Sequence, residues 1–170
     1  MDLLRHTVLF VNPRMTCFSL CPQFFVGCDA GLAEFGIQGA FGWSVSTYLE
    51  ERAASGMGPS RGAVMDSYRA ECSGLLSILR FLIRLSEFSD MFEEWRGAIG
   101  TDSQSMLDRL FCKPTSVNSD QQRFYADLDP LLPERDLLVE IQNSLRILPG
   151  VSVVYVKGHK TIGEPWNNCL

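Results

Sequence analysis

The sequence lacks an uninterrupted apolar run long enough to cross a membrane. The N-terminal stretch MDLLRHTVLFVNPRMTCFSLCPQFF is apolar in patches, but Arg5, His6, Asn12, Pro13 and Arg14 interrupt every run. It also lacks a clean apolar segment followed by a small-residue cleavage site, which is the pattern of a secretory signal. We therefore expect neither a transmembrane helix nor a signal peptide, and an intracellular location that is cytoplasmic or nuclear.

Closely paired cysteines are also missing. The six cysteines include no C-x-x-C pair, and only Cys17 and Cys21 lie near each other in the sequence. A tetrahedral zinc site needs four ligands, and only His6 lies near this pair. We therefore expect scattered buried thiols in a reducing compartment rather than a zinc centre.

An excess of positive charge is absent as well, because the formal net charge is -5. Proteins that bind nucleic acid electrostatically usually carry a basic surface. The charge therefore argues against simple electrostatic binding. It does not exclude a nuclease whose carboxylates hold divalent metal, because the metal reverses the local charge. With 170 residues and 46% hydrophobic content, the chain is expected to form one globular domain.

Two apolar segments predict neighbouring strands in the first third of the chain. Residues 23–28 (QFFVGC) and 36–47 (GIQGAFGWSVST) have strand-like composition, and Asp29 is expected in the turn between them. The following segment AASGMGPSRG, rich in Gly, Ser and Pro, predicts a loop, with residues 62–65 as a short third strand. A meander of three antiparallel strands is the simplest arrangement.

The clearest predicted helix begins next. Asp66 or Ser67 can cap it, and apolar residues then recur at spacings of three and four. These apolar residues are Tyr68, Cys72, Leu75, Leu76, Leu79, Leu82 and Ile83. Glu71 shares their face, so its carboxylate is expected to point toward the sheet.

A further acid follows the next predicted strand. Residues 97–100 (GAIG) predict a strand, Asp102 follows it, and Ser103 can begin the helix SQSMLDRLF. A strand, an acid and a helix start are typical of an active-site position in α/β folds.

The last third predicts one more helix and one more strand. Segment 113–127 is polar and indicates a loop or a broken helix. Residues 133–148 predict a helix that stops at Pro149. The β-branched run 151–156 predicts a buried central strand, which leads directly to His159.

The order of these elements and the positions of three acids resemble ribonuclease H. The matching pieces are VGCDAG around Asp29, SYRAECSGLL around Glu71, IGTDSQS around Asp102 and VYVKGH ending at His159. The resemblance extends from residue 24 to about 160 and is greatest to the ribonuclease H domains of retroelement reverse-transcriptase polyproteins. It implies an α/β fold whose mixed five-stranded sheet, with three antiparallel strands followed by two parallel ones, is flanked by helices.

The resemblance also implies metal-dependent cleavage of the RNA strand of RNA/DNA hybrids. Asp29 would bridge two Mg²⁺ ions, with Mn²⁺ as an alternative, Glu71 would hold one ion and orient water, and Asp102 would complete the cluster. His159 would move protons or help the product leave. The implied partners are an RNA/DNA hybrid and an upstream reverse transcriptase domain of the same polyprotein.

The end of the sequence departs from the family pattern. The family places a fourth acid on a helix after the GH segment, but only eleven residues follow His159 and none is aspartate. Glu164 is the only acid among them, and Pro165 disfavours the helix that would aim it. We therefore expect an N-terminal extension, residues 1–22, and a ribonuclease H-like domain, residues 23–170. This domain lacks most of the final helix and is truncated or degenerate, which would uncover part of the sheet.

Other interpretations remain open. Taken singly, Asp29 is explained as a turn residue, Glu71 as an acid favoured near a helix N-terminus, and Asp102 as a helix cap. A catalytically impaired domain would keep the fold and act as a nucleic-acid-binding or interaction module. A cysteine nucleophile paired with His159 has the least support, because no cysteine lies at a strand-to-helix turn.

Overall fold

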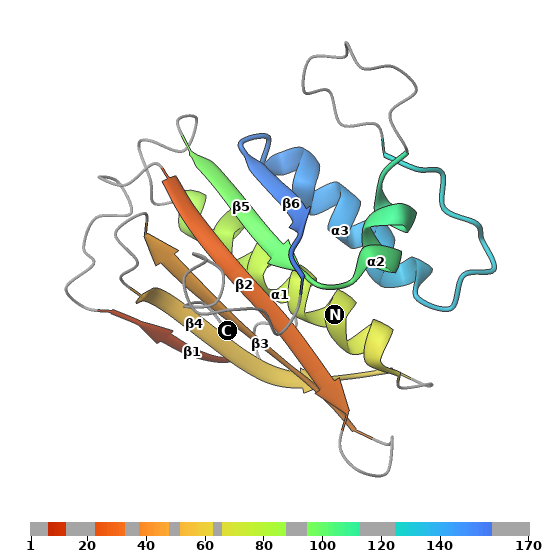
Figure 1. Cartoon of the computed structure of the whole chain (residues 1–170), viewed down its shortest axis with the longest axis horizontal. Helices are drawn as coiled ribbons and strands as arrows, with labels where there is room; N and C mark the ends of the chain where they lie inside the picture. The colour runs from red at the N-terminus through yellow and green to blue at the C-terminus, as the bar shows by residue number, and fades with distance from the viewer. Residues whose placement is uncertain are drawn as a thin grey trace.

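The computed structural model describes residues 7–12, 23–32, 38–47, 52–62, 66–87, 95–112 and 125–157. The elements are β1 (Val8–Val11), β2 (Gln23–Leu32), β3 (Gly39–Thr47), β4 (Arg52–Ser60), α1 (Ser67–Ser86), β5 (Arg96–Thr101), α2 (Gln104–Leu110), α3 (Arg135–Ile147) and β6 (Val151–Tyr155). The strands form one sheet in the order β1-β4-β3-β2-β5-β6, and α1 and α3 lie together behind it in Figure 1. The expected α/β class is confirmed.

The sheet is mixed, as the sequence predicts. Strands β2, β3 and β4 are antiparallel, whereas β5 pairs parallel with β2 and β6 pairs parallel with β5. The sheet has six strands instead of five. The additional strand is β1, which comes from the segment expected to be an extension and pairs antiparallel with β4.

The predicted loop at AASGMGPSRG is wrong, because most of it forms strand β4, paired with both β3 and β1. Its small residues make room for a large neighbour: a Cβ on Gly56 would lie 2.3 Å from the ring of Trp43. The Trp43 indole in turn donates a hydrogen bond to Ser77 of α1, at 3.1 Å. Gly62 is not in a strand, and residues 63–65 of the expected third strand lie outside the described residues.

The turn expected at Asp29 is also wrong. Asp29 lies inside β2 and pairs with Gly42, and the β2–β3 ladder continues to Leu32 opposite Gly39. The alternation of the strand explains the acid: Cys28 faces the core, whereas Asp29 points to the other side and is exposed.

Helix α1 forms as predicted and covers the core. The backbone N–H of Arg69 donates to the Asp66 carboxylate at 2.6 Å, so Asp66 is the N-cap. The apolar face of α1 packs on alternate residues of β2 and β3. The contact is close at Gly74, where a Cβ would lie 2.7 Å from the sulfur of Cys28.

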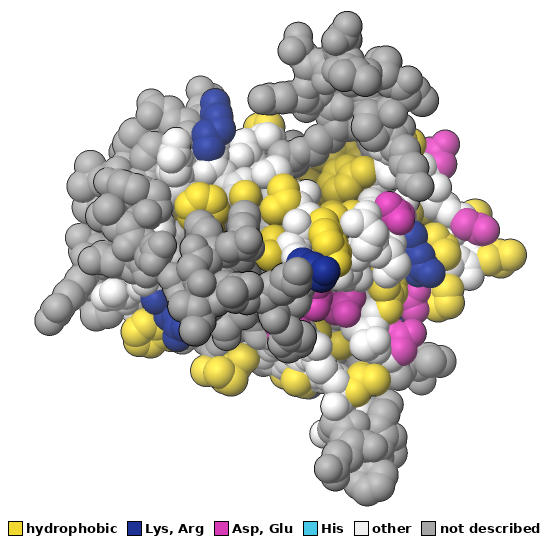
Figure 2. Space-filling view, in the orientation of Figure 1, with side chains coloured by type: hydrophobic (Ala, Val, Ile, Leu, Met, Phe, Trp, Pro, Cys, Tyr) yellow, Lys and Arg dark blue, Asp and Glu magenta, His cyan; other side chains and the backbone are white. Residues whose placement is uncertain are grey.

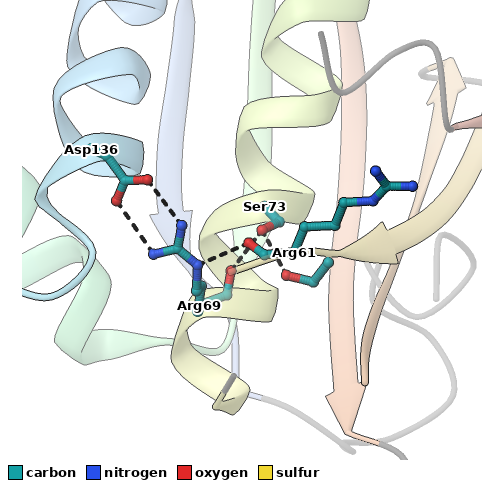
Figure 3. Close-up of polar contacts among 5 residues, drawn as sticks. Arg61, Arg69, Ser73 and Asp136 are labelled. Atoms are coloured by element: carbon teal, nitrogen blue, oxygen red, sulfur yellow. Dashed lines mark hydrogen bonds and ion pairs between the residues drawn. The ribbon is translucent and has the colours of Figure 1, made fainter. Parts of the chain in front are cut away.

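Polar contacts link the start of α1 to α3 and to the end of β4 (Figure 3). The Arg69 guanidinium donates to both carboxylate oxygens of Asp136, at 2.9 and 3.3 Å, and to the carbonyl of Arg61 at 2.9 Å. The hydroxyls of Ser60 and Ser73 are hydrogen-bonded at 2.8 Å. These contacts fix the first turns of α1 relative to the sheet.

The C-terminal elements follow the prediction except in one respect. The expected helices are confirmed as α2 and α3, but the strand expected to be buried and central is β6, which is last in the sheet order. Its residues are mostly half-buried, because β5 is its only neighbouring strand among the described residues. No helix within the described ranges is long and apolar enough to span a membrane.

Candidate functional site

The sheet face opposite α1 carries a groove of about 530 Å³ that leads to Asp29. Paired residues share a face, so two rows cross the four strands β1, β4, β3 and β2 on this side. The rows are Val8–Met57–Gly42–Asp29 and Phe10–Ser55–Ser44–Gly27. The glycine and serine residues in the middle of the rows have small side chains, which do not fill the groove. One end of the groove, at β1, is apolar, and the other end, at β2, is acidic. Figure 2 shows this face, with scattered hydrophobic side chains and acidic ones beside a basic one near its middle.

Asp29 and Asp102 lie at the same edge of the sheet because their strands are parallel neighbours. The β2–β5 register ends with Gly27 opposite Gly100. Two more residues along each strand bring Asp29 beside Asp102, and neighbouring strands are roughly 4.8 Å apart. Both side chains are exposed.

Glu71 comes to this edge from the first turns of α1. Burial raises the pKa of the half-buried Glu71 carboxyl above its usual value of 4.5, and the negative charges of Asp102 and Asp29 raise it further. Burial is also the main cause of the raised pKa of the Cys28 thiol, to which Asp29, Glu71 and Asp102 all contribute. The three acids predicted from the sequence are therefore within electrostatic range of one another.

Ser103 is part of this cluster, a role that the sequence did not indicate. It precedes α2 at the N-cap position, but its side chain makes no capping hydrogen bond. Its hydroxyl is hydrogen-bonded to that of Ser105 at 3.3 Å. The same hydroxyl lies near enough to the Glu71 carboxylate to lower the pKa of that group, against the larger effect of burial. The backbone N–H of Ser103 donates to the hydroxyl of Thr101 at 3.2 Å, which holds this turn after β5.

The carboxylates of this cluster are a suitable type of ligand for a divalent ion, but they are not positioned to bind one ion together. Carboxylate oxygens are the ligands that Mg²⁺ prefers. Within the described ranges, however, no three His, Cys, Asp or Glu side chains are arranged to hold one ion. One oxygen of Asp29 accepts the N–H of Ala30 at 2.7 Å, so it is engaged by its own backbone. Repulsion between the negative charges also favours keeping these carboxylates apart from one another.

The expected histidine lies beyond the described residues. The N–H of Val156 donates to the carbonyl of Thr101 at 2.9 Å, so the chain after β6 leaves from the same edge as Asp102. His159 follows two residues after Lys157, the last described residue of the chain. The structure thus describes neither His159 nor Glu164.

The two buried thiols, Cys28 and Cys72, are poor nucleophiles. Cys28 and Cys72 are buried and unbonded to other cysteines, whereas Cys112 is exposed. Burial raises the pKa of Cys72 to about 12 and that of Cys28 further, so both remain protonated at neutral pH. The pair Cys17 and Cys21 lies outside the described residues.

Several solved structures resemble the chain over most of its length. LC11 ribonuclease H1, isolated from compost, has a TM-score of 0.55 at 13% identity, covering 81% of this chain and 86% of that one. Ribonuclease H1 of the halophilic archaeon Halobacterium salinarum has a TM-score of 0.52 at 17% identity, covering 80% and 86%. A mutant protease-reverse transcriptase of prototype foamy virus has a TM-score of 0.50 at 13% identity, covering 81% and 17%.

LC11 ribonuclease H1 in complex with an RNA/DNA hybrid also matches, with a TM-score of 0.53 at 11% identity, covering 79% and 86%. The sequence matches no protein-family model and no curated protein. The likeness to the solved structures concerns the fold: a mixed sheet with antiparallel strands first, parallel strands after them, and helices packed on it. The chain therefore has the ribonuclease H-like fold, shared with ribonuclease H1 proteins and with a retroviral reverse transcriptase.

Proposed function

We propose that the chain is a metal-dependent endonuclease that cleaves the RNA strand of RNA/DNA hybrids. The observation that carries the proposal is the neighbouring position of Asp29 in β2 and Asp102 directly after β5, with Glu71 of α1 in electrostatic range of both. The likeness in fold to LC11 ribonuclease H1, a protein solved in complex with such a hybrid, supports the same choice of substrate.

The three acids would play different parts because their surroundings differ. Asp29 and Asp102 are exposed and would hold two Mg²⁺ ions, or Mn²⁺, at the sheet edge, with Glu71 as a further ligand. The bound ions would supply an ionised water and stabilise the leaving oxygen. Burial and two like charges disfavour the ionised form of Glu71, so positive charge at this edge would stabilise that form. Ser103 would keep that carboxylate oriented.

The remaining parts of the proposal concern the histidine and the partners. His159, after β6, would move protons near the leaving group, since an imidazole titrates near neutral pH. The hybrid would be recognised by its shape and its 2′-hydroxyls more than by its sequence. The similarity to the foamy virus protein supports a place next to an upstream reverse transcriptase domain.

A second candidate is a catalytically impaired domain that binds nucleic acid or a partner without turnover. It is favoured by the finding that the described residues contain no three acids, histidines or cysteines arranged to hold an ion. The bond from Ala30 to Asp29 points the same way, because it engages one of the two carboxylate oxygens that a cation could bind.

Cleavage of an end-labelled RNA/DNA hybrid in Mg²⁺ or Mn²⁺ tests the proposal. Asp29→Asn and Asp102→Asn should each lower the rate by about 100-fold or more, because each removes a carboxylate ligand. Asp108→Asn is the matched control: this exposed acid of α2 hydrogen-bonds Gln104 at 3.1 Å and should not affect the rate.

The outcomes separate the two candidates. Cleavage by the intact protein that both Asn variants retain would overturn the proposed mechanism. Hybrid binding without cleavage in either metal would support the impaired domain. A parallel Mg²⁺ titration, followed by NMR shifts at Asp29 and Asp102, reports metal binding independently of turnover.

A further inference from the structure

Among the described residues, β1 is an edge strand without the usual protection. It stands at the opposite end of the sheet from β6, and its sequence VLFV has no charge, proline or glycine. All of its side chains are exposed, at 70% for Val8, 43% for Leu9, 55% for Phe10 and 51% for Val11. Natural edge strands commonly carry charges, prolines or bulges that prevent pairing with another chain. Here both faces of the edge strand are apolar.

The charge distribution favours a second copy of this chain as the partner. The protein is acidic, with a formal net charge of -5, so two copies repel each other over most of their surfaces. Strands β1 and β4, in contrast, contain no acidic residue and one cation, Arg52. Pairing of the two β1 strands would therefore bring no acidic side chain of β1 or β4 in one copy against an acidic side chain of these strands in the other.

We propose that two copies of the chain dimerise by antiparallel pairing of β1 with β1, which continues the six-stranded sheet through a two-fold axis. Such an axis is perpendicular to the sheet and keeps the corresponding faces of both copies on the same side. Residues that lie opposite each other must therefore share a face. Of the registers that satisfy that condition, two pair three residues of this four-residue strand, one with Leu9 opposite Leu9 and one with Phe10 opposite Phe10.

The geometry makes this pairing favourable on both faces. On the side that carries the groove, Val8 of one copy lies opposite Phe10 of the other in the Leu9 register, and the two Phe10 side chains lie opposite each other in the Phe10 register. The apolar ends of the two grooves would join, and Leu9 and Val11 would be covered on the opposite face. Asp29 is three strands away from β1 in the sheet order, so the acidic edge of each copy stays open. The inference is thus independent of the proposed cleavage.

Sedimentation velocity from about 10 µM to about 1 mM, a range that includes weak dimers, tests the pairing. The intact protein should shift from monomer to dimer, and Leu9→Lys or Phe10→Lys should weaken the dimer by about tenfold or more, because like charges would face each other at the axis. Leu131→Lys is the control: it places the same charge on a turn residue that is 88% exposed and far from β1 in the sequence, and should leave the dimer intact. Both β1 side chains are already exposed, so the melting temperature should change little.

A charge-pair rescue identifies the register. A mixture of the Leu9→Lys and Leu9→Glu variants should recover the dimer if Leu9 lies at the axis, and the corresponding Phe10 pair should recover it in the other register. A dimer that persists in all β1 variants, or rescue by neither pair, would overturn the proposal. A protein that stays monomeric at every concentration would also overturn the proposal, and the β1 edge would then be available to a strand of another protein. Protection of the β1 amides from hydrogen exchange that is independent of concentration would show that the chain covers its own edge, with the same consequence.

Discussion

Gly74 offers a sharp test of how α1 is placed against the sheet. It lies one turn after Glu71, at a point where α1 packs closely against β2. A Cβ on Gly74 would lie 2.7 Å from the sulfur of Cys28 and 3.1 Å from Cβ of Phe41. The first distance is shorter than a real Cβ contact allows, so Gly74→Ala must move the helix or the thiol.

The expected size of the effect follows from two opposing terms. Alanine stabilises a helix interior over glycine by about 1 kcal/mol. Overpacking a close-packed core costs about 1 to 3 kcal/mol. Gly74→Ala should therefore lower the free energy of unfolding by about 1 kcal/mol in the intact protein. In a Cys28→Ala background the sulfur is gone, so the same substitution should raise it by about 1 kcal/mol. The coupling between the two sites is then about 2 kcal/mol.

Urea unfolding of the intact protein, the two single variants and the double variant measures this cycle. If Gly74→Ala stabilises the protein equally in both backgrounds, it behaves as at an exposed helix position, and α1 is not pressed onto β2. Glu71 would then have no reason to lie close to Asp29, so the result would also weaken the site.

Three further predictions concern single contacts. Because the pKa of Glu71 is raised, the native state binds more protons than the unfolded state above the usual value of 4.5, and stability falls as the pH rises through that window. Glu71→Gln should remove this decline in urea unfolding from about pH 4 to about pH 8, and an unchanged pH dependence would contradict the placement of Glu71. Burial alone would raise the pKa of Asp136, but the hydrogen bond and charge of Arg69 lower it, so this pair stabilises the fold above the usual value of 3.8 and loses its effect as the pH falls. Asp136→Asn should cost only about 0.5 to 1 kcal/mol at neutral pH, since that carboxylate is 61% exposed, and a double-mutant cycle with Arg69→Met that gives no coupling would refute the contact. Gly150→Ala should cost about 3 kcal/mol in the same assay, because its Cβ would lie 1.8 Å from the carbonyl oxygen of Trp95, and a neutral effect would contradict this turn.

Elements defined by local patterns were the most predictable from the sequence. The long periodic run after Asp66 and its capping carboxylate fix α1 without help from other parts of the chain. The order strand, Asp102, helix is equally local. For the same reason the ordered set of acids identified the fold, since each acid has a local marker: Asp29 follows the apolar run of β2, Glu71 lies on the first turns of α1, and Asp102 directly follows β5.

The errors arose where distant residues decide the structure. Strand β4 has the composition of a loop. Its Gly56 is needed because a side chain there would collide with Trp43, thirteen residues earlier in the chain. Pairing with β1 and β3 on its two sides holds the strand. The turn expected at Asp29 failed because the ladder with β3 continues past this residue. The position of β6 at the end of the sheet depends on strand order, which a β-branched run does not reveal. Ser103 was missed as a neighbour of Glu71 for the same reason: Ser103 precedes α2, whereas Glu71 lies on α1, which is distant in the sequence.

The central claim is that three acids distant in sequence share one edge of the sheet, and titration of the Glu71 carboxyl by NMR tests it most directly. The midpoint should lie above 4.5, and it should move down in both Asp29→Asn and Asp102→Asn, because each removes a negative charge close to Glu71. Asp108→Asn should leave the midpoint unchanged. A Glu71 that titrates at its ordinary value, and does not respond to either neighbouring substitution, would show that these carboxylates do not meet.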